Sequence, residues 1–352
     1  MLSENGPEEA RQFFNRLIRE IELPESDFPI SIRPFFEATR QLPDHADWHQ
    51  IRIANALFLD HGPKFLVFLY YKSLPQLYTC AAGAEVLIRT GRLSRQGDDL
   101  EIFARRIAET GQFLMDVMSP DGLLPGGKGI QAIQKVRLIH ASIRKFIGTP
   151  EWNTEMFGAP INQEDMALTL QTFCVSITDA LAQFGITESP EKLEGFYKTW
   201  TYIGHLLGIT PELVPPTASE GRKLLEEILT RKGAASEAGQ LLTNALLKFA
   251  NYTLKGRFEK VPPLLITHLI GKERSRMLGV YAPEGCLGVL LPEFISTLFR
   301  LGENLEDRFE GPKEILIEEL GRQTMKAMLG YFDQVKGRKF VVADQFVSHW
   351  NL

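Results

Sequence analysis

The stretch GGKGIQAIQKVRLIHASIRKFIGT, residues 126–149, decides the fold class, because apolar residues recur along it with the period of an α-helix. His140 lies in the middle of this apolar face. The aliphatic residues on the same side are Ile133, Val136, Ile143 and Ile147. Arg137 and Arg144 share the face, one turn before and one turn after the histidine. The spacing therefore predicts a buried face on which an imidazole stands between two guanidinium groups.

Two interpretations of this face follow from the residues alone. In one, haem b lies against it, with the iron bound to His140 and the propionates neutralising Arg137 and Arg144. In the plainer one, His140 is a core histidine hydrogen-bonded to a carbonyl, and both arginines reach solvent along their aliphatic stems. Spacing alone favours the plainer interpretation, since a single helical histidine forms no motif by itself.

The composition is that of an ordinary globular protein. The 352 residues are 44% hydrophobic and 24% charged, and they suffice for a large core. A net charge of -5 without a basic stripe argues against nucleic acid as a partner. Cys80, Cys174 and Cys286 lack the spacing of a disulfide framework or a zinc site. With neither a secretory signal nor a membrane-spanning apolar run, we expect a cytoplasmic location.

Helical periodicity, punctuated by Gly and Pro, predicts an all-α fold. Besides the His140 helix, the expected helices cover residues 7–22, 46–60, 64–78, 79–93, 98–118, 163–184, 190–207, 219–232, 235–255, 263–279 and 312–335. The helix over 79–93 is rich in small residues, which favours tight helix packing over contact with a flat ligand. Asn162 is expected to cap the helix that follows it. The closing segment should cover the core with Trp350 as a plug.

The helix over 98–118 places polar groups on an aromatic face. Arg106 and Thr110 are one turn apart and can point at the same atom, and Glu109 lies beside them. Such groups either satisfy one another or line a polar spot in an apolar cavity. An internal ion pair between Arg106 and Glu109 is the structural alternative. Elsewhere, His205 is the main rival to His140 as a ligand.

Five motifs resemble one known family in order and spacing. They are TGRL (90–93), RRIAETGQF (105–113), RLIHASIRKF (137–146), FGAPINQEDM (157–166) and YKTWTYIGHLLG (197–208). The family is that of the haem-dependent oxygenases which includes the latex clearing and MpaB-type proteins. The resemblance covers roughly residues 60–215, and the chain looks closer to the MpaB-type branch.

The resemblance implies a globin-like helical core, extended by further helices, that binds one haem b. It implies that His140 is the proximal iron ligand, and that Arg106 and Thr110 lie near bound dioxygen on the distal side. In the latex clearing branch a lysine of the distal helix can ligate iron, whereas Glu109 occupies that position here. A lysine-closed state is therefore not expected. The general base of that branch has no secure counterpart, and Glu85 is only the nearest carboxylate.

Together these features predict a haem b-dependent oxygenase that uses dioxygen on an apolar, isoprenoid-like or lipid-like small molecule. Its catalytic residues are expected to be Arg106, Thr110 and Glu109, with His140, Arg137 and Arg144 holding the haem. An unidentified electron donor is a further expected partner. The alternatives are a non-catalytic haem- or dioxygen-binding or sensor protein, a haem peroxidase or peroxygenase, and a helical scaffold without haem. We expect one integrated domain with an N-terminal extension (1–60), a haem-binding core (61–215) and a C-terminal helical region (216–352).

Overall fold

The computed structural model describes residues 12–13, 16, 29–90, 100–147, 152–253, 259–282, 317–326, 329 and 342–350. The regular elements in these ranges are helices, which confirms the all-α prediction. The one β-bridge found among them is isolated and pairs Cys80 with Gly233. None of the described helices combines the length and the apolar character needed to cross a bilayer.

The first half of the chain forms η2 (Ile30–Ile32), α2 (Arg33–Ala38), α3 (Trp48–Phe68), η3 (Leu69–Ser73), α4 (Leu74–Tyr78), α5 (Ala81–Arg89), α6 (Leu100–Met118) and α7 (Lys128–Ile147). The second half forms α8 (Thr154–Phe157), α9 (Gln163–Phe173), α10 (Val175–Gln183), α11 (Pro190–Leu207), η4 (Pro211–Leu213), α12 (Ala218–Lys232), α13 (Glu237–Thr253), α14 (Val261–Ile270), α15 (Lys272–Met277) and α18 (Asp344–Trp350). Residues 317–326 are also helical.

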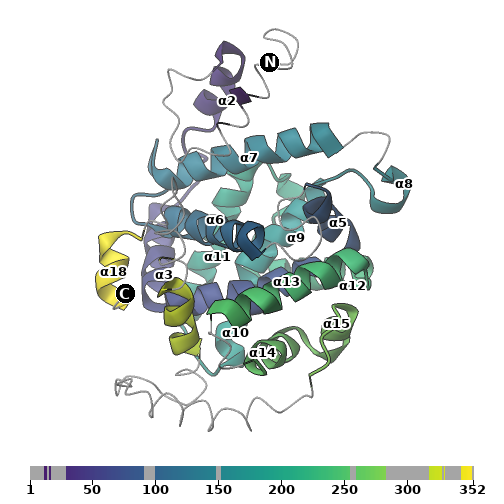
Figure 1. Cartoon of the computed structure of the whole chain (residues 1–352). Coiled ribbons are helices and arrows are strands. Elements are labelled where there is room, and N and C mark those ends of the chain that lie inside the picture. Colours follow the sequence, from purple (N-terminus) through teal and green to yellow (C-terminus); the bar gives the residue numbers. More distant parts are fainter. Residues whose placement is uncertain are drawn as a thin grey trace.

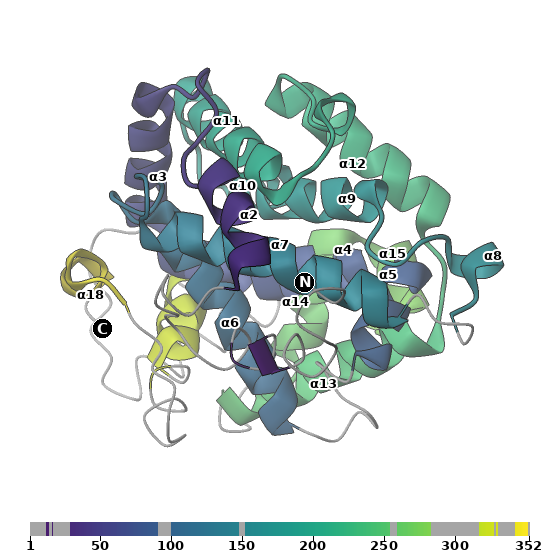
Figure 2. The same cartoon turned by 90° about the horizontal axis from the view of Figure 1, so that it is seen from above.

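The helices pack around a core in which α3 and α11 lie side by side (Figure 1). Helix α7 packs against both α6 and α11, and α2 lies on its outer side (Figure 2). Gln134 of α7 fixes α2 there, because its Nε2 donates a hydrogen bond of 3.1 Å to the Phe36 carbonyl. On the other side of α6, helix α13 packs against α5 and α6. Helix α7 therefore lies between an outer helix and the core.

The sequence predicted two helices where the structure has one. Helix α3 continues through Pro63 to Phe68, then passes into the π-helical turn η3 and into α4. Proline lacks an N–H and normally breaks a helix interior, yet α3 continues through Pro63. The sequence also predicted an interruption at Pro75, and the irregular turn lies just before this residue, which occupies the first turn of α4, where no N–H is needed.

The last described helix supplies the hydrogen bond that Pro63 cannot make. In an α-helix the Leu59 carbonyl would accept from the N–H four residues later, and that residue is Pro63. The Trp350 indole N–H donates to this carbonyl at 2.7 Å instead. Gly62 makes room, because a Cβ there would lie 2.0 Å from the Trp350 ring. Trp350 is 6% exposed and stacks on Phe346, so its predicted role as a plug is confirmed.

Two further predicted helices are each broken once. The helix expected over 163–184 ends at Phe173, and α10 begins after Cys174, whose backbone (φ -110, ψ -77) departs from regular helix. The helix expected over 263–279 is divided at Gly271, whose φ of 82° is accessible mainly to glycine. Most of the helix expected over 7–22 and the cysteine Cys286 lie outside the described residues. The globin-like detail and the division at residues 60 and 215 stay predictions.

We predict that Trp350→Phe lowers the free energy of unfolding by about 1–2 kcal/mol, because it keeps a ring but removes the donor to the Leu59 carbonyl. In a Pro63→Ala background the helix can supply that donor itself, so the same substitution should cost less. Urea unfolding of the double-mutant cycle measures the difference. Equal costs in both backgrounds would show that only ring packing matters.

Candidate functional site

Helix α7 carries His140 with Arg137 and Arg144 on one side, as the spacing predicted. The predicted apolar face is only partly buried, however. Ile133 is fully buried, whereas Val136 and Ile143 are half-buried, and so is His140 itself. The Nδ1 atom of His140 is buried. Apolar side chains of a helix that packs on both sides are normally enclosed, so half-burial here indicates incomplete filling beside α7.

Arg137 is anchored on the carboxyl end of α11. One of its terminal nitrogens donates to the Leu206 carbonyl at 2.9 Å, and the guanidinium lies against Gly208. Gly208 has a φ of 83° and ends α11, so the arginine meets the negative end of the helix dipole. The guanidinium also lies 5.6 Å from the centre of the Phe35 ring of α2. Arg137 therefore does not extend freely into solvent.

Arg144 is held in a similar way by backbone and not by an acid. Its NH1 donates to the Ile161 carbonyl at 3.1 Å and approaches the Met166 sulfur at 3.8 Å. Burial, and then the nearby charge of Arg137, lower the pKa of Arg144. Among the salt bridges of the described residues, none involves Arg137 or Arg144. Two half-buried cations thus repel each other without a neutralising carboxylate.

Helix α6 presents the second set of predicted residues. Arg106 donates to Glu109 at 2.7 Å, so the ion pair foreseen as the structural alternative is present. Glu109 also accepts from Arg105 at 3.2 Å. The Arg106 Nε–H is buried and has no acceptor among the described residues. Leaving a buried donor unpaired costs about 1–3 kcal/mol, so the ion pair alone does not satisfy this guanidinium.

Thr110 uses its hydroxyl inside its own helix. Its Oγ1 donates a hydrogen bond of 2.9 Å to the Arg106 carbonyl. The Thr110 hydroxyl can therefore still accept a hydrogen bond from another group but has no further proton to donate. One turn further, the half-buried Phe113 contacts the rings of Phe173 (α9) and Trp200 (α11) at centroid distances of 6.4 Å. The row of Arg106, Thr110 and Phe113 therefore runs along α6 toward α9 and α11.

The described residues contain two further buried donors that the sequence did not single out. The Tyr78 hydroxyl and the Trp200 indole N–H are buried, and neither has an acceptor in the described part of the chain. Burial raises the pKa of the Tyr78 phenol, and the positive charge of Arg106 opposes this increase only in part. A tyrosine or tryptophan in an apolar helix normally indicates core, so no sequence signal distinguished them.

The structure also shows where the remaining residues named in the sequence analysis lie. His205 is exposed and its ring meets that of His45 on the surface, 6.1 Å away, so it does not rival His140 in the interior. Asn162 caps α9, as expected, by accepting from the Asp165 N–H at 3.0 Å. The small-residue helix, whose described part is α5, packs against α13 as expected, although no atom lies within 4 Å of the Cβ that Gly83 lacks. Glu85 is engaged by Arg89 at 2.6 Å.

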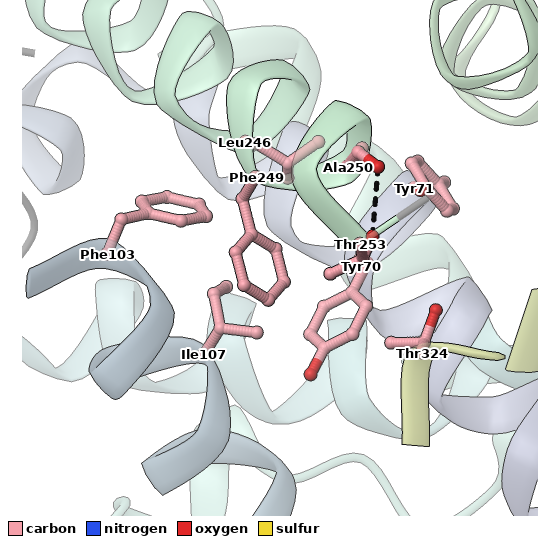
Figure 3. A pocket seen from close by; sticks show the side chains of 9 residues that line it. All are labelled: Tyr70, Tyr71, Phe103, Ile107, Leu246, Phe249, Ala250, Thr253 and Thr324. Atoms are coloured by element: carbon pink, nitrogen blue, oxygen red, sulfur yellow. Dashed lines mark hydrogen bonds between the residues drawn. The ribbon is translucent and has the colours of Figure 1, made fainter. Parts of the chain in front are cut away.

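A small apolar pocket lies between α6 and α13 (Figure 3). Phe103 and Ile107 of α6 face Phe249 of α13 across it, and Tyr70 and Tyr71 of the π-helical turn η3 close it. Thr324 and the end of α13 complete its wall. The pocket is on the buried side of α6, next to the edge that carries Arg106.

A cluster of metal-ligating side chains is not found in the described ranges, in the sense of three or more His, Cys, Asp or Glu. This bears only on ions held by the protein alone. A haem iron takes most of its ligands from the porphyrin, and one imidazole completes the proximal side. The arrangement around α7 thus offers one imidazole, two unneutralised cations and half-buried aliphatic residues.

Comparison with known proteins confirms the resemblance that the motifs indicated. A family model described as "ER-bound oxygenase mpaB/B'/Rubber oxygenase, catalytic domain" matches residues 65–310. The rubber oxygenase of Streptomyces sp. (strain K30) is 25% identical over 262 residues, which are 72% of this chain but only 61% of that protein. The solved structure of latex clearing protein LCP in the closed state is similar in fold, with a TM-score of 0.72 and 20% identity, over 97% of this chain and 90% of the other.

We predict that Glu109→Gln lowers the free energy of unfolding by about 1 kcal/mol, because Arg106 then keeps a partly buried charge without its acid. Glu109→Lys should cost more, since three cations would meet on one turn. Urea unfolding at low and high salt measures both. Glu85→Gln, which loses a more exposed pair with Arg89, is the matched control and should cost less than half as much. Equal costs would mean that the Arg106 pair is an ordinary surface contact.

Proposed function

This chain belongs to the mpaB/B′ and rubber oxygenase family, and we propose on that premise that it is a haem b-dependent oxygenase. Haem b would supply the activation of dioxygen when bound. His140 would be its proximal iron ligand, and the substrate would be an apolar small molecule of isoprenoid or lipid type. The single observation that carries the proposal is the pair Arg137 and Arg144, two half-buried cations beside His140 that lack any acid among the described residues.

The charges on α7 fit the edge of a haem. Within the described residues, Arg137 and Arg144 donate hydrogen bonds to neutral carbonyls and a thioether, and burial followed by the charge of Arg137 lowers the pKa of Arg144. Two neighbouring cations in a partly dry place are costly unless an anion joins them. The propionates of haem b are such anions, and guanidinium groups bind carboxylates through charge-assisted hydrogen bonds. Arg137 and Arg144 would therefore hold the acidic edge.

The apolar surroundings fit the porphyrin plane. Val136, His140 and Ile143 are half-buried on a helix that packs against α6 and α11, and on the α6 side Phe113 is half-buried as well. A flat apolar group between these helices would bury their exposed parts, which is favourable in proportion to the apolar area removed from water.

On the distal side Arg106 would act as donor. Glu109 holds one of its terminal nitrogens, so the guanidinium keeps one orientation while its buried Nε–H stays available. A fixed donor in a place of low dielectric stabilises negative charge that develops on oxygen. Thr110 offers lone pairs in the same row, because its proton is donated to the Arg106 carbonyl. Glu109 would act through Arg106 and not on the substrate.

The substrate class rests on the apolar lining. The small pocket beside α6 is lined mainly by aliphatic and aromatic side chains, so this side of α6 is apolar. A cytoplasmic location and an electron donor as partner belong to the same proposal. A haem sensor or a peroxygenase would use the same residues. Only an oxygenase should convert the substrate when the ferrous protein reacts with dioxygen.

We predict that the purified protein shows a haem b Soret band and that His140→Ala abolishes or strongly weakens it, because the imidazole supplies the iron ligand. The absorption spectrum, reduced and exposed to carbon monoxide, measures this. His205→Ala is the matched control, since that histidine is on the surface, and it should leave the spectrum unchanged. Loss of haem in His205→Ala with retention in His140→Ala would reverse the ligand assignment.

We predict that Arg106→Ala retains haem but slows the reaction of the ferrous protein with dioxygen by about 10²–10³-fold, the usual effect of removing one preorganised donor. Stopped-flow absorption of the reduced protein mixed with dioxygen measures the rate. Arg105→Ala removes the neighbouring, more exposed arginine and should change the rate little. If Arg106→Ala reacts like the wild type, Arg106 has no distal role.

A further inference from the structure

The segment of residues 157–166 links the surroundings of the two arginines on α7. It holds Arg144 directly, because the Ile161 carbonyl accepts a hydrogen bond of 3.1 Å from that guanidinium. Two residues later, the side chain of Gln163 crosses to the carboxyl end of α11, the place where Arg137 is anchored. The surroundings of both arginines therefore depend on the position of one short segment.

Ile161 has an unusual backbone conformation. Its φ is 50°, the one positive value found in the described ranges for a residue other than glycine. A β-branched side chain disfavours this region, so such a residue stays there only where its surroundings impose the conformation. Here the Ile161 side chain packs on the core, and Asn162 closes the turn by donating from Nδ2 to the Ala159 carbonyl at 3.1 Å. The Ile161 carbonyl therefore has a fixed position against Arg144.

The beginning of α9 is fixed to α12 by charged side chains. Asp165 pairs with Lys232, and Glu164 pairs with Arg231, across the interface in which the two helices pack. Because these pairs are charge-assisted hydrogen bonds between two helices, they oppose a shift of α9 along α12. Gln163 is the first residue of α9, so its side chain extends from a backbone that is held in place.

The Gln163 side chain bridges two backbone groups that follow α11. Its Nε2 donates to the Gly208 carbonyl at 3.0 Å, and its Oε1 accepts from the Thr210 N–H at 2.9 Å. Glycine is conformationally permissive, and Gly208, with a φ of 83°, gives the end of α11 more freedom than another residue would. Both ends of one amide are used to restrict that freedom.

Arg137 lies against this bridged segment. One of its terminal nitrogens donates to the Leu206 carbonyl at 2.9 Å, and a Cβ on Gly208 would be only 2.9 Å from the guanidinium carbon. The guanidinium is therefore in contact with the backbone at the end of α11 and bonded to it. A displacement of residues 206–210 would displace Arg137 as well.

We propose that Gln163 is a positioning residue that acts through Arg137. By bridging residues 208 and 210 it holds the end of α11, while the same segment of chain holds Arg144. The two guanidinium groups are thereby kept at one spacing, as a ligand with two acidic groups on one edge requires. This inference rests on the proposed function, and it names the residue that sets how the arginine pair meets the two propionates.

The test compares two probes, haem b and haem b dimethyl ester, which is the same macrocycle with both propionates esterified. Their dissociation constants for the full chain, freed of haem, are measured by titration of the Soret band. The wild type should bind haem b about 30-fold more tightly than the ester, as hydrogen bonds to charged groups predict. Gln163→Leu removes both bridging hydrogen bonds and should reduce this ratio to about threefold, with the affinity for the ester unchanged. A general loss of folding would instead weaken both probes alike.

A double-mutant cycle tests whether Gln163 acts through Arg137. Arg137→Gln should itself lower the ratio, and adding Gln163→Leu to it should lower the ratio no further. Gln240→Leu is the matched control. Gln240 is also an exposed glutamine that bonds to the end of another helix, since its Nε2 donates to the Met277 carbonyl at 3.3 Å. Because this contact joins α13 to α15, its loss should keep the wild-type ratio.

The two proposals fail in different ways. An unchanged ratio in Gln163→Leu, or an equal loss with and without Arg137, overturns the role of Gln163 while the haem proposal stands. A wild-type ratio near one removes the arginine pair from haem binding, and the inference with it, but leaves the iron ligand as proposed. Absence of a Soret band with both probes refutes the proposed function and this inference together.

Discussion

The constraint on which this structure depends is the placement of two like charges on one face of α7. A helix repeat puts Arg137 and Arg144 one turn on either side of His140, so the three cannot be separated without breaking the helix. Among the described residues, the two guanidinium groups donate to the Leu206 and Ile161 carbonyls and contact the Phe35 ring and the Met166 sulfur, and neither meets a carboxylate. Carbonyl dipoles orient a cation but do not neutralise it. Under the proposed function, the propionates of haem b would supply the missing negative charge.

The rest of the fold holds α7 in place, while several residues on its His140 face stay half-buried. Helix α7 is fixed from outside by Gln134, which donates to the Phe36 carbonyl of α2, and from inside by the buried Ile133. The long helix α3 provides the rigid core, and its one missing hydrogen bond at Pro63 is replaced by Trp350 from the end of the chain. A segment almost three hundred residues away in sequence thus completes the central helix, and a hydrogen-bond donor is the reason for its contact.

The polar edge of α6 differs from a simple ion pair. Glu109 accepts hydrogen bonds from Arg105 and Arg106. It thereby orients the Arg106 guanidinium, whose buried Nε–H has no acceptor among the described residues. Because Glu109 is acidic, it lowers the net charge of this edge of α6.

The sequence by itself determined the helical class, the joint placement of His140, Arg137 and Arg144, the row of Arg106 and Thr110, the cap at Asn162 and the covering role of Trp350. Each of these depends on helix periodicity or on a local hydrogen bond, which neighbouring residues specify. Only the tertiary structure decided that α3 continues through Pro63 and that His205 is on the surface. It also decided that the Thr110 hydroxyl donates within its own helix and that the Tyr78 hydroxyl is buried. Those outcomes depend on which distant groups supply or withhold a partner, as Trp350 does for Leu59, and local spacing carries no information about them.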